Sequence, residues 1–545
     1  NDYLGSEYTD GTDDQTDTQK LIAYIRGEDV YGFRSRSIGS SVWKLGDIVY
    51  STPQVVTYDD YSVVYVGGND GMLHAFRLGY LDTTVEDAVA RLQNSKSDTG
   101  YDKLGEELWA FIPKNALPYL RYYADPNYPH LYYIDLSPFV VEVDYDSEHP
   151  GTEKILIGGM RLGGASGCNG DDCLNPPSDT CPDPSNLSNC TGLSCYFALD
   201  ITEPPADPNH PNYPKLLWEF THTDLGFSYS GPAVIKKGNN YYVAFLSGPT
   251  NYSGASGQSL KVFILNLSNG SLVRTIENVL VNGSLAVLNN AFGGRLFTFT
   301  EGGAVYFGYT QEGTWHGGVL KLDTSDDNPS NWTVSMVVSD IGPVTASVKR
   351  EVFGSNEWIF FGGGRYFVKD DDPSDIRYLY GVKPQACAAL ATGHCTRNDL
   401  GDMTLLTGSP TQQGWYIELD SQDGDWGAER LVTDPTVYKR NANAGEIYFV
   451  TMQPNTHPCE FGGRSYIWRV EATTGGVPAE SEMPGTLLVQ LSTGQILEAK
   501  ESSLFAEKGG RRTGPFSGVP GEQAAPILRP ASASWTGTII HWVER

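Results

Sequence analysis

Residues 46–76, GDIVYSTPQVVTYDDYSVVYVGGNDGMLHAF, contain two short β-type runs, a turn at Asn69-Asp70-Gly71 and a third run that ends in an aromatic residue. Asn and Gly tolerate the positive φ of a tight hairpin turn, so the turn explains Asp70 without a catalytic or metal-binding role. The same arrangement returns in degenerate form about every 60 to 90 residues. A repeat of this period is typical of an array of small sheets.

Six copies of the repeat can be followed, and each supplies three or four strands. A copy has an entry run, a β-run that ends near a glycine, and a run that closes on an aromatic residue or Asp. The copies begin near Ser51, Ser137, Gly231, Ala304, Gly342 and Arg430. A remnant, Thr536 to Val543, is expected to complete a seventh sheet with residues from another part of the chain.

Three or four strands are the content of one propeller blade. A single blade cannot bury both of its faces, whereas a ring of blades leaves no long exposed edge. We therefore expect an all-β fold, a modified β-propeller of six to eight blades with seven as the favoured number. Few short helices and long loop insertions complete this expectation.

The expected domain organisation has two parts. Residues 1–45 form an acidic N-terminal lead-in with a short helix over Leu21–Ile25, capped by Asp17 or Thr18. Residues 46–545 form the propeller domain, with a disulfide-rich insertion at 165–195. The other helix candidates are Asp87–Gln93 and Asn115–Tyr122.

Charge and hydrophobicity exclude several classes of protein. The net charge is −28, from 66 acidic and 38 basic residues, so the basic stripe that a nucleic-acid binder needs is missing. The longest apolar runs are too short to cross a bilayer. The first residue is Asn and no leader follows it, so we expect a mature or trimmed product whose export signal is out of view.

The chain has eight cysteines, and the even number favours disulfides in an oxidising compartment. Cys387 and Cys395 are expected to pair. The partners of the other six stay open: Cys168, Cys173, Cys181, Cys190, Cys195 and Cys459. If every thiol is paired, Cys459 must reach one of the five in the insertion. Zinc is the alternative for the insertion, but a spacing of four residues is wide for a zinc knuckle and no His falls in register.

Three carboxylates lie close together around a glycine at Asp420, Asp423 and Asp425. Calcium prefers oxygen ligands clustered on such a loop, so these residues are the candidate metal ligands and calcium is the candidate cofactor. Their spacing misses the usual calcium-loop pattern, and a solvated loop is the competing interpretation. No metalloprotease, hydrolase-elbow, phosphate-loop or haem motif occurs, so no catalytic or cofactor-binding residue is assigned.

Several phrases resemble the PilY-type β-propeller domain of type IV pilus tip-associated adhesins, over nearly the whole chain from about Leu21. They are GDIVYSTPQVV (46–56), VYVGGNDGMLHAF (64–76), ELWAFIP (107–113), YYIDLSP (132–138), CYFALDIT (195–202), WIFFGGGRYF (358–367) and ERLVTDPTVY (429–438). The resemblance implies a seven-bladed propeller akin to quinoprotein dehydrogenases. One departure concerns calcium: where the family often has an Asp-rich loop, residues 296–304 offer only Glu301. Calcium control of pilus retraction is therefore not carried over.

The resemblance implies a non-enzymatic, exported bacterial protein at the cell surface, on the pilus tip, that supports pilus biogenesis, surface adhesion and twitching motility. Its implied partners are minor pilins or the pilus-tip complex, the N-terminal region of the same protein, and a host or abiotic surface. One alternative function is a quinone-dependent dehydrogenase, which would need a cofactor on a Trp floor, a calcium and often two adjacent cysteines. The other is a glycan-binding propeller or a glycosidase.

Overall fold

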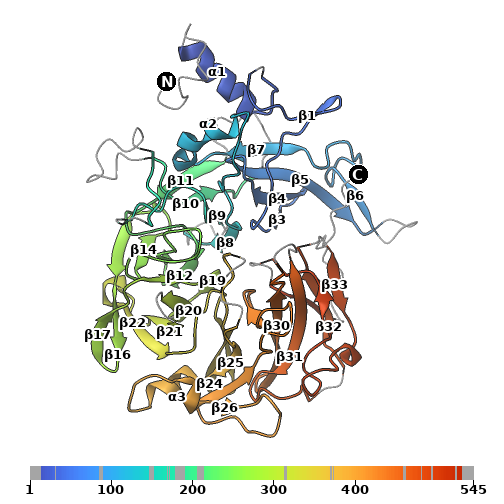
Figure 1. Ribbon diagram of the computed structural model, residues 1–545. Helices are drawn as coiled ribbons and strands as arrows, with labels where there is room; N and C mark the ends of the chain where they lie inside the picture. The colour runs from blue at the N-terminus through green and yellow to red at the C-terminus, as the bar shows by residue number, and fades with distance from the viewer. Residues whose placement is uncertain are drawn as a thin grey trace.

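Seven β-sheets follow one another around a ring in the order in which they occur in the chain (Figure 1). The expectation of a seven-bladed propeller is thereby confirmed. The computed structural model describes residues 14–30, 32–84, 90–145, 153–168, 170, 172–177, 191–204, 214–311, 316–368, 371, 374–457, 462–479, 482–492, 495–521 and 525–530. Among them, no helix has the length and apolar character that crossing a bilayer requires.

Apart from β19, the first three sheets are built from consecutive strands joined by antiparallel pairing. Sheet one contains β3 (Gln54–Thr57), β4 (Ser62–Gly67), β5 (Leu73–Asp82), β6 (Arg91–Gln93) and β7 (Glu107–Phe111). Sheet two contains β8 (Phe139–Val143), β9 (Glu153–Gly159), β10 (Tyr196–Asp200) and β11 (Lys215–Phe220). Sheet three contains β12 (Ala233–Lys237), β13 (Asn240–Leu246), β14 (Val262–Asn266), β15 (Leu272–Ile276) and, parallel to β12, β19 (Thr298–Thr300).

The next two sheets each carry additional short strands. Sheet four contains β16 (Asn278–Val281), β17 (Ser284–Val287), β18 (Ala291–Gly293), β20 (Gly303–Gln311), β21 (His316–Thr324) and β22 (Thr333–Val338). Sheet five contains β23 (Lys349–Phe353), β24 (Asn356–Gly362), β25 (Tyr378–Val382), β26 (Gly401–Asp402) and β27 (Gly414–Glu418).

The last two sheets close the sequence of blades. Sheet six contains β28 (Arg430–Leu431), β29 (Thr436–Asn441), β30 (Ala444–Pro454), β31 (Gly463–Glu471) and β34 (Phe516–Ser517). Sheet seven contains β32 (Gly485–Gln490), β33 (Ile496–Ala499) and β35 (Ile527–Pro530). Thr536–Val543, expected here, lies outside the described residues; the strands found in this sheet were not expected from the repeat.

The helices are few, as expected, but the predicted cap of the first helix and the predicted position of the second are wrong. α1 covers Asp14–Ile25, so Asp17 and Thr18 lie inside it and do not cap it. The expected helix at Asp87–Gln93 is replaced at its end by strand β6, which pairs with β5. The helix expected at Asn115–Tyr122 is present as η1 (Lys114–Tyr119) and α2 (Leu120–Tyr123).

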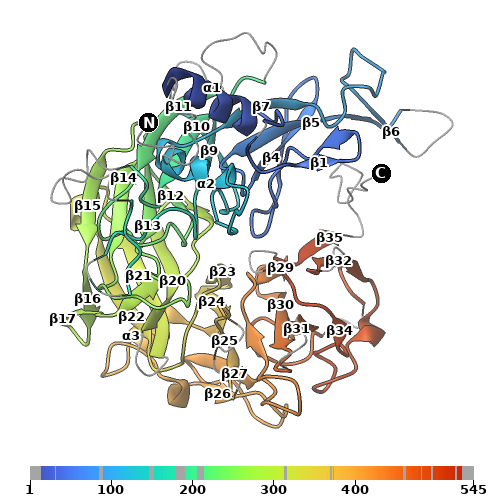
Figure 2. The same ribbon diagram turned by 45° about the horizontal axis from the view of Figure 1, so that its top comes forward.

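The remaining elements are short. They are the hairpin strands β1 (Ser37–Ile38) and β2 (Ser41–Val42), the helix α3 (Pro384–Ala388), and the 3-10 turns η3 (Pro329–Asn331), η4 (Arg397–Asp399) and η5 (Ser502–Leu504). α1 and the β1–β2 hairpin lie outside the ring beside sheet one (Figure 2).

Six hydrophobic clusters hold the ring together, and each lies between two successive sheets. They join sheets one and two, two and three, three and four, four and five, five and six, and six and seven. In the part of the chain that is described, no such cluster joins sheet seven to sheet one. The core is therefore distributed among the blade interfaces and has no single centre.

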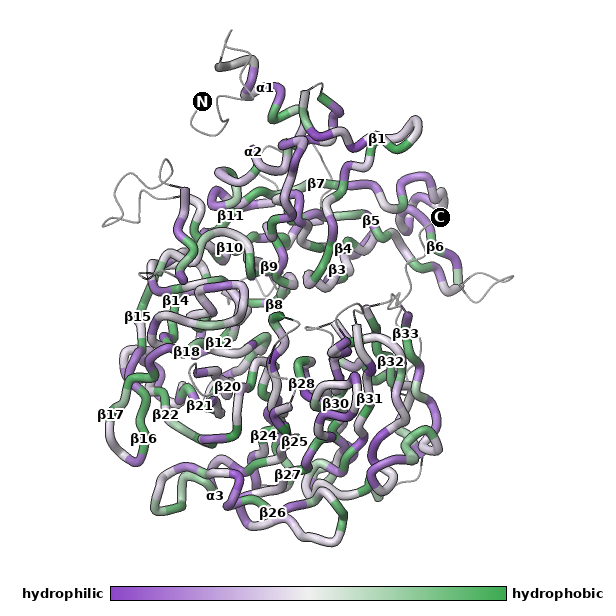
Figure 3. The backbone as a smooth tube through the Cα atoms, in the orientation of Figure 1, coloured by the Kyte–Doolittle hydropathy of each residue, from purple (hydrophilic) through white to green (hydrophobic). Residues whose placement is uncertain are grey.

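The alternation of side chains along one strand explains how a blade contributes to two clusters. On β20, Val305 and Phe307 face sheet three, while the intervening Tyr306 faces sheet five. On β13, Phe245 packs toward sheet two and its neighbour Ala244 toward sheet four. Because successive residues of a strand point to opposite faces, a strand buried on both faces must be apolar throughout. Figure 3 shows such a hydrophobic stretch on β9, which is buried from Ile155 to Gly159.

A disulfide joins Cys387 to Cys395 within the cluster between sheets four and five, and both cysteines are fully buried. Cys387 lies on α3, and the Cys395 backbone N–H donates to the Val337 carbonyl of β22 at 2.9 Å. The bond therefore holds the α3-containing loop between β25 and β26 of sheet five against sheet four.

We expect Phe245→Ala to lower the free energy of unfolding by about 3–5 kcal/mol, because it leaves a cavity between two sheets. The Phe245 ring is fully buried and stacks on Tyr196 with centroids 3.8 Å apart. Urea denaturation followed by circular dichroism measures the loss. Leu272→Ala is the control, because Leu272 is 43% exposed on β15, and it should cost less than about 1 kcal/mol. Equal losses in the two variants would contradict a core located between the blades.

Replacing Cys387 and Cys395 together by Ala is expected to lower the free energy of unfolding by about 2–3 kcal/mol. The separation of eight residues closes a short loop, whose restriction of the unfolded chain is worth this much. Denaturation of the parent and the double variant without reductant measures the difference. If the two chains unfold at the same urea concentration, the bond does not stabilise this interface.

Candidate functional site

The acidic loop that was the calcium candidate is occupied by ion pairs. Asp420 contacts the Lys508 ammonium at 2.5 Å and the Arg512 guanidinium at 2.7 Å. Burial would raise the pKa of Asp420, but the hydrogen bond from Lys508 and the charge of Arg512 lower it below its ordinary value. Arg512 also reaches the fully buried Glu429 at 2.6 Å. Asp420 thus belongs to a network of ion pairs that also contains Lys508, Arg512 and Glu429.

The other two candidates do not join Asp420 around a common point. Asp423 forms a turn with Trp426 through two backbone hydrogen bonds of 2.9 and 3.0 Å, and the Asp425 carbonyl accepts from Thr456. The described residues contain no group of three or more His, Cys, Asp or Glu side chains placed to hold a metal ion. Glu301 is the single carboxylate in residues 296–304, where the family often has an Asp-rich loop. Its carboxylate oxygen lies 3.7 Å from the Lys236 ammonium nitrogen.

In the cysteine insertion, Cys168 is bonded to Cys173. This bond removes both from any zinc site. Cys195 is a free, buried thiol whose pKa burial raises well above its usual range, so the condition that every thiol is paired fails there. Cys181, Cys190 and Cys459 lie outside the described residues.

An arginine–aspartate pair joins segments of sheets four and six. Arg295, in the segment between β18 and β19, is fully buried and donates to Asp434 of the β28–β29 segment at 2.7 Å through Nη2 and 3.1 Å through Nε. It also donates to the Val432 carbonyl at 2.6 Å. Asp434 in turn accepts from the Ser347 backbone at 2.9 Å. Sheets four and six are not neighbours, and Ser347 belongs to the segment that enters sheet five between them, so this pair links segments of three successive sheets.

A second contact of this kind joins sheets five and three. Arg365, which follows β24, donates to the Gly254 carbonyl at 2.8 Å and pairs with Asp371 at 2.9 Å. Phe367 packs against Tyr229 with ring centroids 5.4 Å apart, and a Cβ on Gly254 would lie 2.3 Å from the Phe367 ring.

His74 is held between two carboxylates on sheet one. Its Nε2 lies 3.1 Å from Asp70 and its Nδ1 lies 2.6 Å from Glu107. Burial would lower the pKa of His74, but the hydrogen bonds to Asp70 and Glu107 raise it to about 9. Asp70 also accepts from the Gly46 backbone at 2.8 Å, so the charged pair fastens the lead-in chain to the hairpin. Asp70 therefore does more than form the expected turn.

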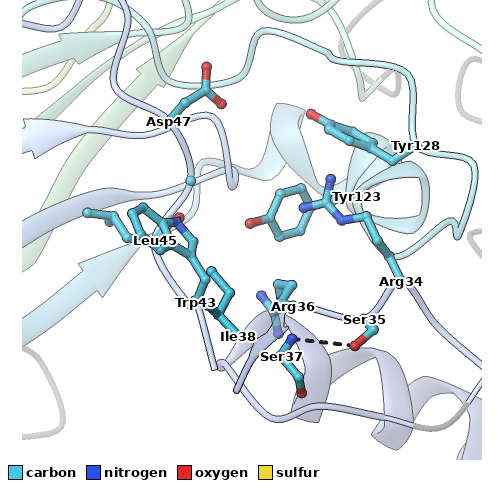
Figure 4. A pocket seen from close by; sticks show the side chains of 11 residues that line it. Arg34, Ser35, Arg36, Ser37, Ile38, Trp43, Leu45, Asp47, Tyr123 and Tyr128 are labelled. Carbon is cyan, nitrogen blue, oxygen red and sulfur yellow. Dashed lines mark hydrogen bonds between the residues drawn. The ribbon is translucent and has the colours of Figure 1, made fainter. Parts of the chain in front are cut away.

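A cavity of about 410 Å³ lies where the lead-in meets sheet one and α2 (Figure 4). On one side Arg34 covers the Tyr123 and Tyr128 rings, with its guanidinium carbon 4.6 and 4.3 Å from their centroids. Trp43 and Ile38 lie on the other side. The sequence pattern did not indicate this site, because its walls come from segments about 80 residues apart and carry no motif.

Raising the pH from 7 to 10 is expected to destabilise the parent chain more than the His74→Gln variant. The His74 pKa is about 9 in the folded chain and 6.5 otherwise, so its stabilisation is complete below pH 6.5 and is lost as pH rises through 9. The shift is worth roughly 3 kcal/mol. Urea titrations at pH 7, 8, 9 and 10 measure the difference between the two chains. A difference that stays constant over this range would show that His74 is not charged in the fold.

No family model matches the chain, but curated proteins resemble it over most of its length. A type IV pilus biogenesis factor PilY1 homologue of Xylella fastidiosa (strain Temecula1) is 25% identical over 519 residues, covering 86% of this chain and 30% of that protein. The type IV pilus biogenesis factor PilY1 of Pseudomonas aeruginosa (strain PAO1) is 26% identical over 556 residues, covering 85% of this chain and 41% of that protein. The chain thus spans less than half the length of these curated relatives.

Solved structures resemble the chain only distantly. Drosophila Semaphorin 1b, extracellular domains 1-2, has 9% identity and a TM-score of 0.31, with 87% of each chain covered. An exo-1,5-alpha-L-arabinanase from a bovine ruminal metagenomic library has 8% identity and a TM-score of 0.27, covering 84% of this chain and 99% of that one. Scores this low carry no argument about function. The curated homologues of this chain are type IV pilus biogenesis factors of the PilY1 type, which confirms the resemblance found in its sequence.

Proposed function

We propose that this chain is the propeller part of an exported protein of a type IV pilus system, and that it acts in pilus biogenesis without catalysing a reaction. The observation that carries this proposal is the similarity to PilY1 factors over 85–86% of the chain. In this proposal the propeller sits at the filament tip at the cell surface and contacts minor pilins, the N-terminal region of its own protein, and a host or abiotic surface. Surface adhesion and twitching motility would follow from that position.

The construction of the ring supports a platform more than a catalyst. Sheets that are not neighbours in the ring are joined by the Arg295–Asp434 pair and by the hydrogen bond from Arg365 to the Gly254 carbonyl. Buried ion pairs with several hydrogen bonds resist separation, because an unpaired buried charge is costly. A rigid ring leaves the loops as the variable contact surface. The disulfides fit the oxidising compartment in which an exported protein works.

The proposal is tested in a bacterium that encodes this chain. Deleting the coding segment should reduce the number of surface filaments and abolish twitching, as counted by electron microscopy and measured by colony spreading. Complementation with the parent chain or Leu272→Ala should restore both. Phe245→Ala should restore less, because it weakens the ring. Labelled antibody against the propeller should mark one end of purified filaments.

Two results would count against the proposal. Filaments of normal number with no label at either end would separate the chain from the pilus. Reduction of a dye by the purified chain supplied with a quinone cofactor, calcium and an alcohol would favour the dehydrogenase alternative.

A further inference from the structure

The cavity between the lead-in and sheet one contains two arginines that are not neutralised by carboxylates. In the part of the chain that the structure describes, neither Arg34 nor Arg36 forms an ion pair, although acidic residues outnumber basic ones by 66 to 38. The other buried arginines described above, Arg295, Arg365 and Arg512, each have a carboxylate within 2.9 Å. This pair is therefore a local positive charge on an acidic protein.

Arg36 is the more constrained of the two. It is 6% exposed, and its Nη2 donates to the carbonyls of Tyr24 and Glu28 at 2.5 and 3.0 Å. Its Nε and Nη1 are buried and have no hydrogen-bond partner among the described residues. Its guanidinium carbon lies 3.8 Å from the centre of the Tyr24 ring, which fixes the plane of the group. A buried charged group with unpaired donors is costly, so the Arg36 guanidinium favours an acceptor at this wall of the cavity.

The opposite wall offers apolar surface. Trp43 is 56% exposed and Ile38 is 64% exposed, and both line the cavity. The Trp43 indole N–H donates to the Leu45 carbonyl at 2.6 Å, so the ring is held in place with its face uncovered. Trp, Tyr and Arg are the residue types that carry most binding energy where proteins meet. Here all three line one cavity.

We infer that this cavity binds a carboxylate presented by a polypeptide, with an apolar residue of that polypeptide packed on Trp43. Guanidinium groups match a carboxylate through paired hydrogen bonds. Asp47 lies at the rim, held by His130 at 2.8 Å, and its charge disfavours polyanions such as phosphates or sulfated glycans. The net charge of −28 disfavours them further. The inference goes beyond the proposed function and stands without it, since any partner with this chemistry would fit.

The test uses the full chain and a panel of short capped peptides, each with one Glu flanked by varied Leu, Val and Tyr residues. Each has a counterpart with Gln in place of Glu. Calorimetric titration should show at least one Glu peptide binding about tenfold or more tightly than its Gln counterpart. Arg34→Gln should remove that preference. Arg91→Gln is the matched control, because Arg91 is an exposed arginine on β6 outside the cavity, and it should leave binding unchanged.

Tryptophan fluorescence gives a second readout. The bound peptide should change the emission of the parent chain, and Trp43→Phe should lose this change. The inference is overturned if no Glu peptide binds at millimolar concentration, if Glu and Gln peptides bind alike, or if Arg34→Gln keeps the preference. Tighter binding of inorganic sulfate, phosphate or heparin than of any Glu peptide would replace the polypeptide by a polyanion as the occupant. Peptide binding lost in Arg91→Gln would place the site elsewhere.

Discussion

Burial of both faces of every sheet is the constraint on which this structure depends. A sheet of three to six short strands cannot shield its own faces, so each blade needs a neighbour on either side. The side chains of β13 and β20 meet this need by sending alternate residues into two different clusters. The six clusters thereby couple the stability of each blade to that of the next. The polar contacts and the cavity described above lie mainly on segments between strands and beside sheet one, outside these clusters.

The sequence was most informative where one local pattern marks both a turn and a buried strand. The Pro- or Gly-containing entry followed by an apolar run located six sheets, because turns and buried strands are local properties. Sheet seven was not located, although Pro484 and Gly485 precede the apolar run of β32, because it has only three described strands and β35 comes about 30 residues after β33. The helix expected at Asp87–Gln93 failed because pairing with β5 overrides a weak helical preference at β6.

The candidate sites could be predicted less well, because their chemistry depends on residues far apart in the chain. Three carboxylates in a loop suggested calcium, yet Asp420 meets Lys508 and Arg512 from a segment about 90 residues away. His74 has Asp70 nearby in sequence, but its second partner, Glu107, comes from β7. Arg36 and Tyr123 likewise meet only after the lead-in has folded against α2. Such partnerships are set by topology, which no local motif encodes.

The Arg295–Asp434 pair has a mechanical consequence. It joins sheets four and six, which share no hydrophobic cluster. A displacement of one of these sheets therefore acts on the other directly, and not only through sheet five. Force applied to sheet four is then shared with sheet six directly as well as through sheet five. The linked sheets are therefore expected to move together, so that the loops they carry keep their spacing when a force acts on the ring.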